Sequence, residues 1–179
     1  MQKPLLLLAL AGLPLLLAPR TSSAADGVVS LENVSFDDDG TTLTIHAQVS
    51  NATPQRIFFY ASERRFLFEE KTRTLTVVMH SVPTAPTGSS GDCHVSAPRF
   101  RAVDAAATQQ LDLPVPRHLH WLHDGKPTTV SGVPDHVRVE LGWSDSPLTL
   151  GPEDASLCNF EADTKLKALE RGVLVQSSP

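Results

Sequence analysis

Apolar and polar residues alternate at every position between residues 42 and 49, and this pattern constrains the fold more than any other feature of the sequence. Its apolar members are Leu43, Ile45, Ala47 and Val49. Successive side chains of a strand point to opposite faces, so a period of two gives one apolar face and one polar face. That arrangement is typical of an antiparallel sheet with one solvated side. The alternation recurs over residues 74–80 and 137–143, and we therefore predict an all-β fold.

Turn residues separate the alternating runs at short intervals. The sequence Asp37–Gly40 predicts a tight hairpin, because glycine accepts the positive φ that such a turn needs. Residues 82–92 are rich in Pro, Gly, Ser and Thr and predict an exposed loop. Strands are predicted over residues 29–36, 42–49, 56–61, 65–69, 74–80, 100–103, 109–115 and 137–143. About seven or eight short strands of this kind predict an antiparallel β-sandwich.

This predicted sandwich is immunoglobulin-like only in a loose, architectural sense. In a true immunoglobulin domain the first cysteine of the disulfide lies on the second strand, and a tryptophan follows soon after it. Here Cys93 comes after several predicted strands, and Trp121 and Trp143 fall at different distances. The likeness implies two packed sheets and assigns no site residue.

The hydrophobic period changes near the C-terminus. Leu166 and Leu169 lie three positions apart with Ala162 one helical turn earlier, so residues 160–171 predict a short helix. Gly172 suits the end of that helix. We expect the terminal residues 176–179 to be frayed.

The N-terminus has the features of a secretory signal peptide. Lys3 supplies a positive charge, residues 5–17 are mostly apolar, and the small residues that follow place cleavage after Ala24 or Ala25. The apolar run is shorter than the roughly 20 residues that span a membrane. We therefore expect a signal peptide over residues 1–25 and a single β-sandwich domain over residues 26–179. The mature protein is expected to be exported, either periplasmic or secreted, with no transmembrane segment after cleavage.

The chain has two cysteines, Cys93 and Cys158. In an oxidising compartment, an even pair of cysteines forms a disulfide by default. Such a bridge would close a loop of about 65 residues and contribute about 4 kcal/mol by restricting the unfolded chain. A catalytic or metal-binding thiolate is the alternative interpretation.

Charge and motifs narrow the range of functions. Lys and Arg number 15 against 20 Asp and Glu, a net charge of −5, whereas a nucleic-acid-binding surface is basic. The sequence contains neither a glycine-rich phosphate loop nor a G-x-S-x-G motif. We therefore interpret the chain as a non-enzymatic binding or accessory module for an unidentified protein partner.

Phe58 and Tyr60 lie in a predicted strand that is apolar on both sides. Packing in the core is one explanation for such residues. The alternative is that they lie on an outer face and form a partner-binding patch.

Three histidines within six residues form a local group of potential metal ligands. His118, His120 and His123 suit Zn or Cu, since both metals are bound by neutral imidazole. In a strand, His118 and His120 share a face and His123 points away, whereas in a turn all three converge with Asp124. The other interpretation is a polar loop without a metal, in a protein that uses no cofactor. A periplasmic or extracellular Zn- or Cu-binding protein is thus the alternative function.

Overall fold

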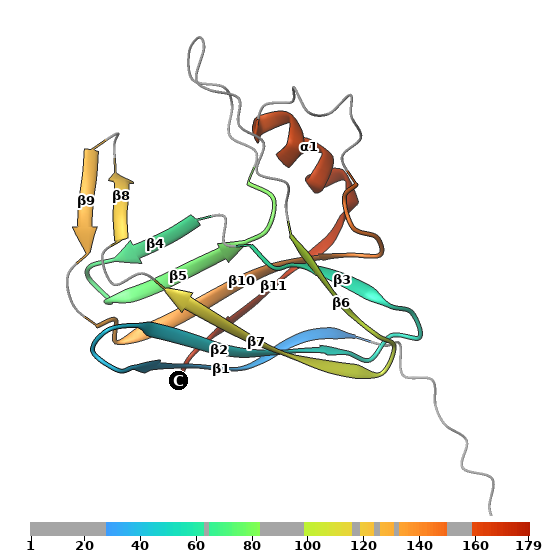
Figure 1. Ribbon diagram of the computed structural model, residues 1–179, viewed down its shortest axis with the longest axis horizontal. Coiled ribbons are helices and arrows are strands. Elements are labelled where there is room, and N and C mark those ends of the chain that lie inside the picture. Colours follow the sequence, from blue (N-terminus) through green and yellow to red (C-terminus); the bar gives the residue numbers. More distant parts are fainter. Residues whose placement is uncertain are drawn as a thin grey trace, which may run out of the picture.

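A computed structural model of the chain describes residues 28–62, 65–82, 99–115, 119–123, 126–130, 133–149 and 159–179. These residues form two packed β-sheets, a separate two-stranded ribbon and one helix outside the sandwich (Figure 1). The prediction of an all-β fold with a short helix near the C-terminus is confirmed. Within the described ranges, no helix combines the length and apolar character that crossing a membrane requires.

The first sheet has three strands in the order β1–β2–β7. They are β1 (Val29–Asp38), β2 (Leu43–Asn51) and β7 (Ala107–Val115), and both pairs are antiparallel. Along β2, buried and half-buried residues alternate without interruption, as the sequence predicts. The β1–β2 hairpin turns at Gly40, whose φ of 88° lies in the left-handed region that favours glycine. The hairpin predicted at this position is confirmed.

The second sheet has six strands around a central β10 (His136–Ser144). The others are β3 (Ile57–Tyr60), β4 (Arg65–Glu69), β5 (Thr74–Met79), β6 (Phe100–Val103) and β11 (Glu170–Ser177). Strands β5 and β10 are parallel, whereas the remaining pairs of this sheet are antiparallel. One parallel pair therefore departs from the predicted antiparallel pairing.

The hydrophobic core lies between the two sheets. Alternate residues of the facing strands supply it, so the apolar positions that the sequence pattern singled out become its centre. Its buried members are Val29, Leu31, Val34, Leu43, Ile45, Ala47, Val49, Ile57, Phe59, Leu75, Val77, Met79, Val103, Leu111, Leu113, Val115, Val137, Val139 and Leu141.

Strand β10 has two different neighbours along one of its edges. Arg138 pairs with β11 and with β5, while Trp143 pairs with β11 and with β3. Because β11 follows one edge of β10 throughout, β5 and β3 must succeed each other along the opposite edge. The change of neighbour falls at Gly142, between these two pairings.

A side chain at position 142 has no room at this junction. A Cβ atom there would lie 2.8 Å from Glu170 Oε2, 2.8 Å from His80 Cβ and 2.9 Å from Tyr60 Cε2. The ends of β5 and β3 and the start of β11 therefore meet on the backbone of β10.

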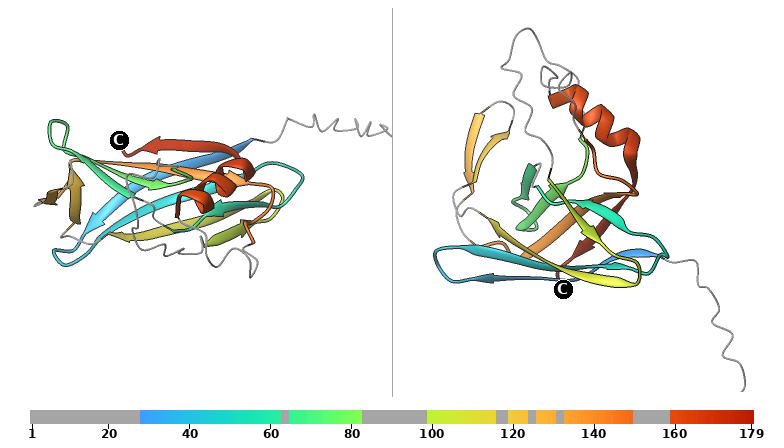
Figure 2. Two further views of the ribbon diagram at one scale, coloured as in Figure 1. Left: turned by 90° about the horizontal axis from the view of Figure 1, so that it is seen from above. Right: turned by 45° about the vertical axis from the view of Figure 1, so that its right-hand side comes forward.

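The C-terminal region differs in part from its prediction. Helix α1 (Asn159–Leu169) forms where a helix was expected, and it lies on the side of the second sheet that faces away from the first (Figures 1 and 2). The prediction of frayed terminal residues is wrong, because β11 continues to Ser177 and the Ser178 N–H donates to the Val137 carbonyl at 2.8 Å. Gly172 lies within β11 and does not cap the helix.

A short ribbon of β8 (Leu119–His123) and β9 (Lys126–Val130) forms a sheet of its own. Its two strands are antiparallel and pair with each other, not with either main sheet. Figure 1 shows it beside β4, at the end of the sandwich away from α1.

A buried asparagine links the end of β2 to the chain that crosses between the sheets. Asn51 is 1% exposed. Its Nδ2 donates to the carbonyls of Gln55, Val103 and Asp104 at 2.8–3.1 Å. Its Oδ1 accepts from both the backbone N–H and the hydroxyl of Thr53. The side chain is fully hydrogen-bonded, which is the condition for burying an amide at low cost.

The junction on β10 predicts unequal effects of alanine at two strand glycines. Gly142→Ala should lower the free energy of unfolding by about 1–3 kcal/mol, because the added methyl group overlaps its neighbours. Gly172→Ala is the matched control, since its Cβ would meet Trp143 Nε1 at the milder distance of 3.3 Å. Urea denaturation of both variants measures the difference, and equal losses would contradict the crowding at position 142.

Candidate functional site

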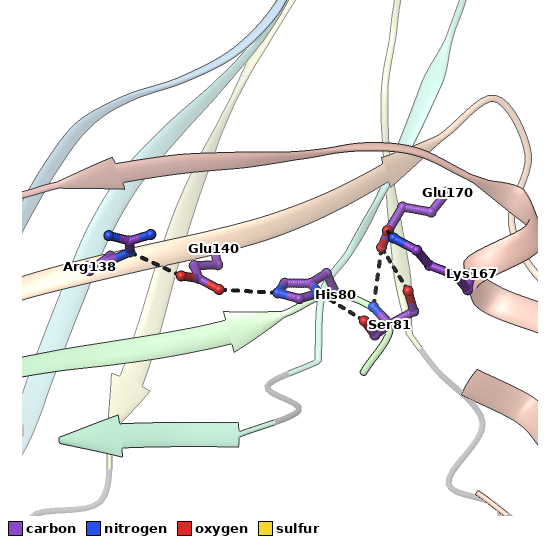
Figure 3. A network of polar contacts seen from close by, with 6 residues as sticks. All are labelled: His80, Ser81, Arg138, Glu140, Lys167 and Glu170. Carbon is purple, nitrogen blue, oxygen red and sulfur yellow. Dashed lines mark hydrogen bonds and ion pairs between the residues drawn. The ribbon is translucent and has the colours of Figure 1, made fainter. Parts of the chain in front are cut away.

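A network of polar side chains runs along the outer face of the second sheet, and one end of it reaches α1 (Figure 3). The contacts join the end of β5, the middle of β10, and the segment at which α1 passes into β11 (Figure 3). The members are His80, Ser81, Arg138, Glu140, Lys167 and Glu170.

Glu170 is the most deeply buried ionisable group of this network. Its side chain is 1% exposed. One carboxylate oxygen, Oε2, accepts from the backbone N–H of Ser81 at 3.2 Å and from its hydroxyl at 3.1 Å. The other, Oε1, lies 2.5 Å from Lys167 Nζ. A buried charge costs several kcal/mol unless it is paired, and these donors provide the pairing.

His80 occupies the position directly after β5 and contacts acceptors through both ring nitrogens. Its Nε2 lies 3.2 Å from Glu140 Oε2, and its Nδ1 lies 2.9 Å from the carbonyl oxygen of Ser81. The ring can donate to both acceptors only when both nitrogens carry a proton. Arg138 Nε donates to the second oxygen of Glu140 at 3.0 Å.

The geometry does not pair the serine with the histidine. A serine nucleophile needs a base within hydrogen-bond reach of its hydroxyl. The hydroxyl of Ser81 instead donates to Glu170, while the imidazole of His80 faces a backbone carbonyl and Glu140. The network therefore serves to hold β5, β10 and the α1–β11 segment together.

A second polar group lies on the exposed face of the first sheet and links its three strands. His46 on β2 contacts Asp112 on β7 through Nδ1 at 2.7 Å and Asp37 on β1 through Nε2 at 3.3 Å. The hydrogen bond to Asp112 is the largest influence on the pKa of His46, which is raised above 6.5. Burial, the next largest influence, lowers this pKa, and the charges of Asp112 and Asp37 raise it by smaller amounts. The imidazolium form thus connects neighbouring strands across the sheet.

Phe58 and Tyr60 take the same face of β3, the face turned away from the core. Tyr60 is only 1% exposed, because α1 covers it. Its hydroxyl donates to the carbonyl of Leu166 at 3.1 Å, and its ring packs edge-on against Phe100 at 5.0 Å. Tyr60 therefore lies on the outer face but is covered, whereas Phe58 is half-buried. Whether Phe58 contacts a partner stays a prediction.

Of the histidine cluster, His118 lies outside the described residues, and the side chains of His120 and His123 are not described. The segment Leu119–His123 is a strand, which is the first of the two predicted alternatives. In the described part of the chain, no three His, Cys, Asp or Glu side chains are grouped to hold a metal ion. The Zn or Cu site stays a prediction that metal analysis of untagged protein tests.

Cys93 and Cys158 both lie outside the described residues. The predicted disulfide therefore stays a prediction. Cys93 falls between Ser81 and Phe100 in the sequence, and Cys158 immediately precedes α1.

The chain was compared with known proteins at three levels. No family model matches it, and neither curated proteins nor solved structures show a significant similarity.

Sequence reasoning missed the members of the network in Figure 3. Ser81 and Glu170 are 89 positions apart, and neither belongs to a motif. The one local signal was the position of His80 and Ser81 directly after an apolar strand, where the chain leaves the sheet.

The buried carboxylate predicts a large loss of stability on truncation. Glu170→Ala should lower the free energy of unfolding by about 2–3 kcal/mol, because both donors of Ser81 then lack an acceptor. Lys167→Ala should cost less than about 1 kcal/mol, since this lysine is 58% exposed. Chemical denaturation distinguishes the two. Equal losses would mean that the ion pair, not Ser81, stabilises this region.

The His46 contacts predict a pH-dependent contribution to stability. Because the pKa of His46 is raised in the folded state, its contribution is complete below pH 6.5 and is lost as the pH rises through the folded pKa. Its size should stay under about 1 kcal/mol, as expected for exposed pairs.

NMR titration measures the individual influences on His46. Asp112→Asn should lower the pKa of His46 more than Asp37→Asn does, since Asp112 supplies the largest contribution. A larger effect of Asp37→Asn would contradict this order.

Proposed function

We propose that this chain is an exported β-sandwich that acts by binding a protein partner, and that Cys93 and Cys158 are joined by a disulfide. The signal-peptide features of residues 1–25 support export, and an oxidising destination favours the disulfide. The binding role is inferred from the polar contacts of the two sheets, which join strands to one another.

The observation that carries the disulfide part of the proposal is that one end of the Cys93 segment contacts the element that follows Cys158 directly, and the other end is linked to it through Tyr60. At one end, Ser81 donates two hydrogen bonds to Glu170. At the other end, Phe100 packs on Tyr60, whose hydroxyl donates to Leu166 of α1. Ser81 and Phe100, which flank the Cys93 segment in the sequence, are therefore both linked to the α1–β11 unit.

Chain length is compatible with a bridge between these segments. Cys93 follows Ser81 by twelve residues, which reach about 40 Å when extended. Helix α1 has 11 residues and is about 16 Å long. The position before α1 is thus well within reach of the Cys93 segment.

The polar groups of the outer faces hold the scaffold together. Glu170 and Ser81 connect α1–β11 to β5, and His46 connects the strands of the first sheet. Rigid scaffolds of this kind commonly present loops for recognition, and residues 82–92 have the composition of such a loop. We therefore favour recognition of a partner over catalysis.

Export and the disulfide are tested together on protein made in a secreting host. We expect a mature start at Ala25 or Asp26. We also expect an intact mass without alkyl label under non-reducing conditions and with two labels after reduction. Two labels without reduction would contradict the disulfide, and an uncleaved N-terminus would contradict export.

The binding role is tested by capture from the native exported fraction. The oxidised mature protein, immobilised, should capture a partner. The amount captured should saturate, and excess soluble protein of the same sequence should compete with the capture. The matched control is the same protein after reduction and alkylation. It measures non-specific capture by exposed apolar surface. Absence of saturable capture would contradict the binding role.

A further inference from the structure

Strand β4 forms an edge of the second sheet. One of its edges pairs antiparallel with β5, and the other pairs with no strand in the part of the chain that the structure describes. The β8–β9 ribbon lies beside β4 but is hydrogen-bonded as a separate sheet. Within these described residues, the backbone groups along this edge of β4 take part in no ladder, which is the condition for adding a further strand.

The sequence of β4, Arg-Phe-Leu-Phe-Glu, is complementary to itself in the antiparallel direction. Centred on Leu67, a second copy of the strand would bring its Glu69 opposite Arg65 and its Phe68 opposite Phe66. Leu67 would meet its own counterpart on the twofold axis. Opposite charges and apolar side chains at directly opposed positions are the pairs that stabilise a sheet.

Both faces of β4 fit this register. Phe66 and Phe68 point inward and are half-buried against the core, so a second pair of phenylalanines would extend the same apolar layer. Leu67 lies on the other face and is 43% exposed, one of the few large apolar side chains at the described surface. Arg65 and Glu69 flank it and are exposed.

Two other edge strands contain backbone or side-chain features that interfere with strand addition. In β7, Pro114 lacks an N–H group, and the side-chain amide of Gln109 donates to the carbonyl of Gln110 at 3.1 Å. In β11, the amide of Gln176 donates to the carbonyl of Ser177 at 3.3 Å. No proline interrupts β4.

We propose that β4 is a self-association site, at which a second copy of this chain pairs antiparallel about Leu67. The two second sheets then form one continuous sheet across a twofold axis. Because the interface is small, we expect a reversible dimer with a dissociation constant of roughly tens of micromolar. The proposal does not depend on the partner-binding role described above.

Charge exchange tests the register directly. Arg65→Glu and Glu69→Arg should each abolish self-association, because each puts like charges opposite one another at both ends of the pair. Mixing the two single variants should restore a dimer, as should combining both substitutions in one chain. Sedimentation equilibrium of the mature protein over a concentration series measures each case.

Two further variants complete the experiment. Leu67→Lys should abolish the dimer by placing two lysines on the twofold axis, and the exposed position of Leu67 leaves the fold intact, as circular dichroism will verify. Val175→Lys on β11 is the matched control, 47% exposed in the wild type, and should leave the dimer unchanged.

A wild-type chain that stays monomeric at several hundred micromolar, roughly ten times the expected dissociation constant, would overturn the proposal. So would a dimer that survives the single charge reversals. Either result would leave capture of another protein from the exported fraction as a separate question, because that experiment measures a different complex.

Discussion

The hydrogen bonds between Ser81 and the buried carboxylate of Glu170 join the end of β5 to the start of β11, beside the antiparallel ladder that β11 forms with β10. A carboxylate that is almost wholly removed from water must have donors, so this contact forces the end of β5 against the start of β11. Only glycine fits at position 142, because that carboxylate and the end of β3 occupy the space that a side chain would need. The placement of α1 over Tyr60 then follows, since α1 leads directly into Glu170.

The strands with strong local alternation were predictable because one face of each is buried. In β2, β5 and β10, the period of two fixes which residues face the core before any partner strand is known. The pairing of β5 with β10 was not predictable, because their parallel alignment is set by a long connection and not by local pattern. Strand β11 was missed for a related reason: it forms as a strand by pairing with β10, more than twenty-five residues earlier in the chain.

In the candidate site, too, the features set by local sequence pattern were predictable and those set by distant contacts were not. The sequence placed Phe58 and Tyr60 together on one face of a strand, and they share that face. It could not show that a helix 106 positions away covers Tyr60. The pairing of Ser81 with Glu170 was equally hidden, since a polar residue in a turn and another at a helix end carry no signal until the chain is folded. Local periodicity assigns faces, whereas burial on an outer face depends on what packs there.

The burial of Asn51 has a consequence for how the chain tolerates modification. Asn51-Ala52-Thr53 has the acceptor pattern for an N-linked glycan, and the sugar would be attached to Nδ2. That nitrogen donates to three backbone carbonyls in the interior, so a glycosylated Asn51 and this fold exclude each other. Asn33, in the sequence Asn33-Val34-Ser35, is itself exposed, and its Nδ2 donates to the side-chain oxygen of Gln48 at the surface, so it does not meet that conflict. In a eukaryotic secretory pathway, burial of Asn51 would compete with its glycosylation. A chain whose β2 pairs with its neighbours first would fold, whereas a chain glycosylated at Asn51 first could not reach this fold.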